Sequence, residues 1–155
     1  MSTRSRNVAS PLGALRLTAT EGAIVRLDWA GDAAPGGDTG PLLDRAARQL
    51  AAYFAGTLTC FDLPLTPHGT EHERAVWREM QTIGYGATRS YGEIARMIGS
   101  SARAFGTACG RNPIPIIIPC HRVLAAGGGI GGYSGAGGTT TKRRLLALEG
   151  AMLDV

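Results

Sequence analysis

One cysteine in this sequence stands in surroundings that suit nucleophilic chemistry. Cys120 is followed directly by His121 and Arg122 and is preceded by the proline-flanked run 113–119. Cationic groups beside a thiol can lower its pKa, and the thiolate is the nucleophilic form of cysteine. We therefore expect Cys120 to be a reactive thiolate whose pKa is lowered toward neutrality.

A carboxylate can complete a site of this kind. Glu149 lies far from His121 in the sequence. A carboxylate that holds an imidazole in place helps it to act as a general base toward a nucleophile. We therefore treat Cys120, His121 and Glu149 as candidates for a relay, formed directly or through water.

The other cysteines, Cys60 and Cys109, fit the ordinary role of small buried apolar side chains. Three cysteines without close pairing argue against a disulfide framework and for a reducing compartment. The first residues lack the apolar region of a signal peptide, and no apolar run approaches the roughly 20 residues of a membrane span. We expect a cytoplasmic protein that has no contact with membranes.

Positive charge is concentrated in one part of the chain. The net charge is +4 overall, whereas residues 85–144 carry eight basic residues against the single acid Glu93. A segregated basic surface rich in arginine is typical of proteins that meet phosphate backbones, although a solvated basic face would have the same composition.

The first part of the chain predicts an antiparallel sheet with one helix. Residues 14–29 alternate apolar and polar side chains around the turn Thr20-Glu21-Gly22, which is typical of a hairpin. Apolar residues at helical spacing predict a helix over 42–54, and 58–65 is expected to be a short strand. The turn-forming residues 66–70 predict a linker. We place the domains at residues 1–66 and 67–155.

The second part predicts helices around an irregular centre. Ser90 with Glu93 is a capping-box pattern, and Gly99 separates two short helices in the arrangement of a helix-turn-helix. The prolines of 112–118 exclude a helix, so we expect an extended buried segment that delivers Cys120. Helices are expected over 71–83, 91–98, 102–109 and 139–149.

The run from Pro113 to Val123, Pro-Ile-Pro-Ile-Ile-Ile-Pro-Cys-His-Arg-Val, resembles the active-site signature of the O6-alkylguanine-DNA alkyltransferases. The resemblance covers nearly all of the second half of the chain, through residues 74–77, 88–95, 102–106, 112–113, 132–135 and 145–150. It is looser in the first half, where it rests on residues 10–13, 50–56 and 61–65.

This resemblance implies an α+β protein with a ribonuclease-H-like N-terminal sheet and helix, and a C-terminal winged-helix-like domain with a helix-turn-helix. It also implies DNA repair by direct reversal. The alkyl group on O6 of guanine, and of O4-alkylthymine as well, would pass irreversibly to Cys120, once per protein molecule. The expected partner is double-stranded DNA that carries the lesion, and we expect a monomer.

The resemblance also implies roles for individual residues. His121 and Glu149 would activate Cys120 through a bridging water, and Asn112 would support the turn near the thiol. Because guanine in a duplex cannot present O6 to a thiolate, the nucleotide must rotate out of the stack. Arg103 would fill the gap and Tyr91 would help to rotate the phosphate. The pocket residues would be Pro115, Val123, Tyr133 and Ser134.

We expect neither a cofactor nor a metal ion. Cys60, His68 and His72 lack a second compact ligand pair, and a G-x-G-x-x-G pattern at 127–132 lies outside any dinucleotide-binding unit. Two rival functions stay open. The first is a lesion-binding module that flips the base but cannot repair it because it lacks the acceptor cysteine; the presence of Cys120 argues against it. The second is a cysteine hydrolase that uses Cys120, His121 and Glu149; the basic helix-turn-helix argues against it.

Overall fold

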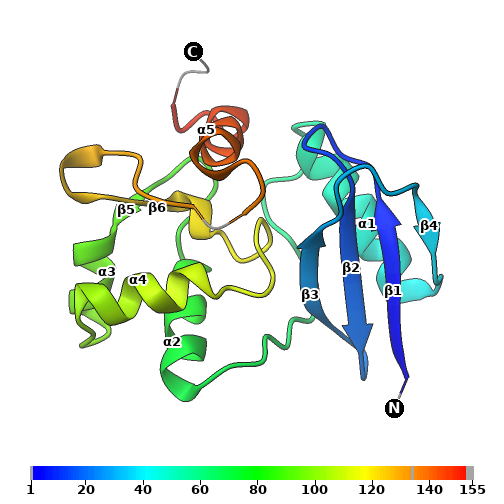
Figure 1. The fold of residues 1–155 in the computed structure, drawn as a ribbon, viewed down its shortest axis with the longest axis horizontal. Helices are drawn as coiled ribbons and strands as arrows, with labels where there is room; N and C mark the ends of the chain where they lie inside the picture. Colours follow the sequence, from blue (N-terminus) through cyan, green and yellow to red (C-terminus); the bar gives the residue numbers. More distant parts are fainter. Residues whose placement is uncertain (1, 134, 153–155) are drawn as a thin grey trace. The chain divides into compact units, whose positions relative to one another are not determined.

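The computed structural model describes residues 2–133 and 135–152 and shows an α+β protein. The chain forms two compact units, Met1–His68 and Gly69–Val155, which are considered separately below (Figure 1). Among the described residues, no helix combines the length and the apolar composition needed to cross a bilayer.

The N-terminal unit contains the antiparallel sheet. Its spatial order is β3-β2-β1-β4. The predicted hairpin is confirmed as β2 and β3, whose connection places Glu21 at φ 54° and Gly22 at φ 80°, the geometry of a two-residue primed turn. The strands are β1 (Thr3–Val8), β2 (Leu15–Thr20), β3 (Ala23–Trp29) and β4 (Gly36–Gly37). The first of them, β1, was not expected from the sequence.

One helix, α1 (Pro41–Phe54), packs on a face of this sheet and confirms the predicted helix (Figure 1). Its stripe of Leu43, Ala46, Leu50 and Tyr53 is buried at 3- and 4-residue spacing. Burial of this apolar stripe against the sheet is the main source of the helix's stability.

The strand expected over 58–65 is wrong. Only Leu65 forms a bridge, with Ile24 of β3. Upstream, the backbone of Asp62 is bonded by α1 side chains: its N–H donates to Oε1 of Gln49 at 2.9 Å, and its carbonyl accepts from Nε2 of Gln49 at 3.0 Å. The peptide groups that a ladder would use are therefore already satisfied by the helix.

The C-terminal unit is mostly helical. Its helices are α2 (Glu71–Met80), α3 (Tyr91–Met97), α4 (Ala102–Gly110) and α5 (Gly138–Leu148). The predicted capping box of α3 is present, since Ser90 accepts from the Glu93 N–H and Glu93 accepts from the Ser90 N–H. α2 ends three residues before the expected end at 83, because Thr82 and Ile83 turn back onto the carbonyls of Glu79 and Met80.

The helix-turn-helix consists of α3, the turn 98–101 and α4 (Figure 1). Buried Trp77 of α2 donates from Nε1 to the Ala108 carbonyl at 2.9 Å and so fixes α4 on α2. A short parallel pair joins β5 (Arg89–Ser90) to β6 (Val123–Leu124). Between α4 and β6 the chain forms the 3₁₀ turn η1 (Cys120–Arg122), against which α5 packs.

Candidate active site

The segment that precedes Cys120 is a set of tight turns, so the expected extended conformation is wrong. The Asn112 side chain supplies hydrogen bonds that a neighbouring strand would supply to an extended segment. Its Oδ1 accepts from the Ile114 N–H at 3.0 Å, and its Nδ2 donates to the Ile118 carbonyl at 2.8 Å. The Ile118 N–H donates to the Ile114 carbonyl at 2.9 Å. Ile116 adopts φ 73°, a strained conformation for a β-branched residue. The Asn112 side chain therefore joins the two ends of this turn.

Cys120 begins η1 and is 6% exposed. Burial raises the pKa of its thiol above the ordinary value, although hydrogen bonding from Asn112 and the charge of Lys142 act in the opposite direction. The expectation of a lowered pKa is therefore wrong for the free protein. The reason is geometric, since the Arg122 side chain extends to Glu149 and to the Ile83 carbonyl.

A buried ion cluster lies next to Cys120 in the sequence. His121 Nε2 is 2.7 Å from Oε2 of Glu149. Arg122 donates to the same carboxylate from Nε at 2.8 Å and from Nη2 at 3.0 Å. The structure thus brings His121 and Glu149 into direct contact and adds Arg122, a member that the sequence did not suggest.

His121 is fully buried, and its pKa is lowered, chiefly by burial and against the opposing effect of Glu149. A neutral imidazole that faces a carboxylate through Nε2 must carry its proton there. Its Nδ1 is then a lone-pair acceptor, and no described residue supplies a hydrogen-bond partner for it. His121 Nδ1 is therefore free to accept a proton.

Lys142 is a further buried charge, which sequence reasoning missed. Its ammonium group is 0% exposed and donates to the carbonyls of Val123 at 2.6 Å and Gly132 at 3.1 Å. It also lies 5.7 Å from the centre of the Tyr91 ring. Lys142 thereby connects α5, β6 and the loop that carries Tyr133, and its charge favours the thiolate of Cys120.

A pocket of about 320 Å³ opens onto Cys120. Tyr91 and Tyr133 line it together with Cys109 and Cys120, and the other described residues of its wall are glycines. Burial raises the pKa of Tyr91 to about 12 and that of Tyr133 further still, so both phenols stay protonated and can donate hydrogen bonds.

Three other residues expected at the site are not among those that line the pocket. Arg103 is exposed on the first turn of α4. Pro115 is buried in the turn before Cys120, and Val123 is fully buried, with its carbonyl bonded to Lys142. Ser134 lies outside the described residues.

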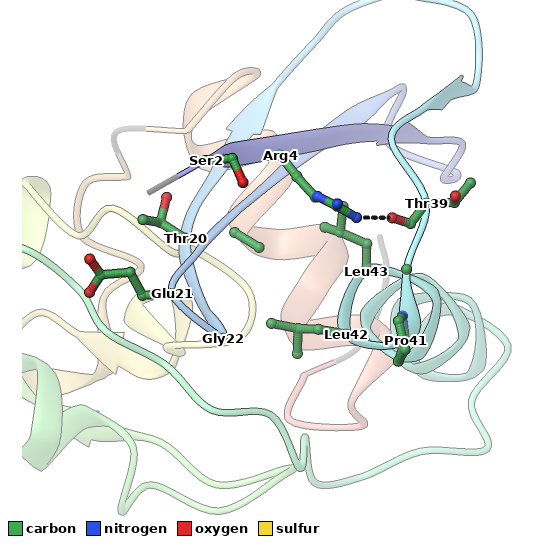
Figure 2. Close-up of a pocket in the computed structure, with 11 residues that line it drawn as sticks. Ser2, Arg4, Thr20, Glu21, Gly22, Thr39, Pro41, Leu42 and Leu43 are labelled. Carbon is green, nitrogen blue, oxygen red and sulfur yellow. Dashed lines mark hydrogen bonds between the residues drawn. The ribbon is translucent and has the colours of Figure 1, made fainter.

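The N-terminal unit contains a second cavity, of about 470 Å³, between the β2–β3 turn and the start of α1. Figure 2 shows Arg4 reaching across it to the Thr39 carbonyl, an interaction of 3.0 Å. Arg4 and Glu21 are the charged residues of its wall, which contains no thiol or imidazole. Nor do the described residues of either unit gather three His, Cys, Asp or Glu side chains suited to a metal ion.

Comparison with protein families gives two matches. Residues 5–67 match the ribonuclease-like domain of 6-O-methylguanine DNA methyltransferase, and residues 71–151 match its DNA-binding domain. A methylated-DNA–protein-cysteine methyltransferase of Mycolicibacterium paratuberculosis is 47% identical over 151 residues, which cover 93% of this chain and 90% of that protein. One from Methanosarcina acetivorans is 54% identical over 108 residues, 68% of each chain.

Solved structures agree with these matches. The O6-methylguanine methyltransferase of Mycobacterium tuberculosis superposes with a TM-score of 0.83 at 41% identity and covers 99% of this chain and 96% of its own. A structure of Mycobacterium tuberculosis OGT in complex with DNA gives a TM-score of 0.80 at 43% identity over 94% of this chain and 91% of that one. The predicted fold class is confirmed by these likenesses. The chain belongs to the 6-O-methylguanine DNA methyltransferase family.

Proposed function

We propose that this protein repairs DNA by moving the alkyl group of O6-alkylguanine onto the sulfur of Cys120. Membership of the family supports methyl transfer from methylated DNA to a protein cysteine. One observation carries the choice of acceptor. Cys120 alone among the three cysteines both lines a pocket and adjoins the buried His121–Glu149 pair in the chain.

The proton of Cys120 must leave for the sulfur to attack. His121 accepts it at Nδ1 through one water molecule, and Glu149 stabilises the imidazolium that results. Asn112 and Lys142 favour the thiolate as it forms. The sulfur then bonds to the alkyl carbon and the bond from that carbon to O6 breaks. Guanine leaves as it takes up a proton from water, to which His121 returns the proton that it accepted from Cys120. The thioether product is a poor leaving group, so each molecule reacts once.

Access to O6 requires rotation of the nucleotide out of the duplex. Arg103 is exposed on α4, where it can occupy the space that the base leaves. Tyr91 lies in the pocket wall at the start of α3, where its ring can meet the backbone of the rotated nucleotide. Phosphate contacts from the basic residues, which carry no sequence information, supply most of the affinity.

The pocket holds the rotated base. We propose that Tyr133 flanks the ring, and that Pro115, Ser134 and the backbone of Val123 contact the base, as the resemblance implies, although Pro115 and Val123 are buried outside the pocket wall in the free protein. O4-alkylthymine places the same kind of alkyl ether at a comparable position, and we propose that it is a second substrate. We also propose that the protein acts as a monomer in the cytoplasm, with domains of residues 1–66 and 67–155.

The experiment that tests this function is intact-protein mass spectrometry after mixing with an excess of duplex DNA that contains O6-methylguanine. We expect a gain of one methyl group per protein molecule, mapped to Cys120, and no gain in a Cys120→Ser variant. A parallel reaction with O4-methylthymine DNA tests the second substrate.

Other outcomes of this experiment would indicate a different function. Tight binding of the lesion with unchanged mass indicates a lesion-binding module. Conversion of more lesions than protein molecules indicates an enzyme that turns over, such as a cysteine hydrolase. A methyl group on Cys60 or Cys109 in the native protein would refute the choice of acceptor.

A further inference from the structure

The pocket described above contains two thiols. Cys109 of α4 and Cys120 of η1 both lie in its wall, each is 6% exposed, and both are free. Alkyl transfer as proposed above uses only Cys120. Cys109 is therefore a buried nucleophile beside the reacting group that has no part in the reaction.

Cys109 contacts α2 on one side and the pocket on the other. Its thiol donates to Sδ of Met80 on α2 at 3.6 Å. The glycines on either side, Gly106 and Gly110, have open space where a Cβ would stand, with no atom within 4 Å. The α4 wall is therefore open next to Cys109, and a small group bound in the pocket can approach its sulfur.

Burial raises the pKa of Cys109 to about 12, so its thiol is protonated in the free protein, as that of Cys120 is. The charge of Lys142 acts in the opposite direction on both sulfurs. A group already bound to Cys120 lies in the pocket that Cys109 lines, so Cys109 can react second.

We infer that Cys109 is a second alkyl acceptor, which reacts when the group delivered to Cys120 carries a leaving group at its far end. The substrate class is guanine bearing an O6-haloalkyl group, a bifunctional adduct. The inference rests on the proposed function of Cys120 as the first acceptor.

The two steps balance as follows for an O6-(3-bromopropyl) group. The Cys120 thiolate attacks the carbon bonded to O6, the carbon–oxygen bond breaks, and guanine leaves. Cys109 then attacks the carbon bonded to bromine, bromide leaves, and the thiol proton of Cys109 passes to water. The product is a propylene bridge between two thioethers. Because both sulfurs share one pocket, the second step is intramolecular and competes well with attack by water or DNA.

The test is intact-mass and peptide analysis of the native protein after reaction with duplex DNA that contains O6-(3-bromopropyl)guanine. Only molecules that have gained a propyl unit on Cys120 are compared. We expect almost all of them to lack bromine and to yield one cross-linked pair of peptides, from Cys109 and Cys120. In Cys109→Ala and Cys109→Ser variants, the loaded molecules should keep bromopropyl or its hydrolysed form on Cys120, with no bridge.

Two results overturn the inference. Native protein that keeps bromopropyl or hydroxypropyl on Cys120 beside a free Cys109 shows that the second thiol is out of reach. If this DNA does not load Cys120, dibromopropane applied to the native protein at alkaline pH supplies the same bridge directly, and its absence is equally decisive. Failure of the proposed function is separate, because it would appear as absence of methyl transfer from O6-methylguanine to Cys120.

Discussion

Replacing Glu149 by Gln removes one charge from the centre of the C-terminal unit and conserves the shape of the side chain. The Glu149 carboxylate accepts hydrogen bonds from His121 at 2.7 Å and from Arg122 at 2.8 and 3.0 Å. Its side chain is 0% exposed and that of Arg122 is 9% exposed. The amide of glutamine presents one NH₂ group to these donors, so at least one hydrogen bond is lost and the guanidinium is left without a counter-charge.

The size of the effect follows from this burial. Leaving one partner of a buried pair uncompensated typically costs about 3–5 kcal/mol. Exposed arginine–carboxylate pairs contribute roughly 0–1 kcal/mol. The chain offers a matched control in Arg26 and Asp28, which form a similar two-bond pair at 2.8 and 3.2 Å on exposed side chains. Asp28→Asn should therefore lower the free energy of unfolding by no more than about 1 kcal/mol.

Urea unfolding measures both variants. Trp77 is buried in the C-terminal unit and, in a Trp29→Phe background, its fluorescence reports on that unit alone; Asp28→Asn is followed by circular dichroism. A loss for Glu149→Gln that is no larger than the loss for Asp28→Asn would refute the account of Glu149 as the centre of a buried ion cluster. The same variant should transfer methyl groups about a hundredfold more slowly, since His121 loses its orienting partner.

Three further predictions concern DNA, backbone strain and pH. Arg103→Ala should slow methyl transfer from duplex DNA at least about tenfold, and a lesion in single-stranded DNA, which needs less unstacking, should restore part of the rate in a single-turnover assay. Gly131→Ala should destabilise the protein by about 1–3 kcal/mol in urea unfolding, because φ is 70° and the new Cβ would lie 3.1 Å from the Tyr91 ring; equal loss in Gly132→Ala, where no atom lies within 4 Å, would contradict this. The pKa of the Cys109 thiol is raised from its ordinary value of 9.0 to about 12 on folding, so above pH 9.0 the unfolded chain loses this proton more readily than the folded protein. The protonated thiol therefore contributes its full share to the free energy of unfolding below pH 9.0, and this contribution is lost as the pH rises toward 12. Unfolding measured across this range should show a loss of stability that is smaller in Cys109→Ala.

The regular elements could be predicted where the local pattern determines the structure. Glu21-Gly22 suits a primed turn between alternating strands, and Ser90 with Glu93 forms the expected capping box. β1 escaped prediction because Thr3–Val8 buries little, with Val8 its one buried residue. The false strand near Asp62 failed for the opposite reason, since distant side chains of α1 took its backbone hydrogen bonds. Such partners cannot be recognised from the local pattern.

In the site, too, residues placed by a local pattern could be predicted and residues placed by distant contacts could not. Lys142 begins the basic run 142–144, and three consecutive basic residues usually indicate a solvent-exposed face. Its position three and four residues before Leu145 and Leu146 places it on the buried side of α5, and this spacing is the signal that could have found it. The contact of Arg122 with Glu149 had no such signal, because it depends on how η1 and α5 pack.

The raised pKa of Cys120 protects its sulfur from unwanted reactions. A protein that is consumed by one reaction loses its function whenever its sulfur meets another electrophile or oxidant, and reactivity toward both follows the thiolate fraction and exposure. In the free protein Cys120 is 6% exposed and burial keeps its thiol protonated. In the reaction proposed above, removal of that proton depends on His121, whose own pKa is lowered by burial and whose Nδ1 is without a hydrogen-bond partner among the described residues. A thiol kept protonated by burial is less reactive toward such electrophiles than the thiolate formed by neighbouring cations that the sequence had led us to expect.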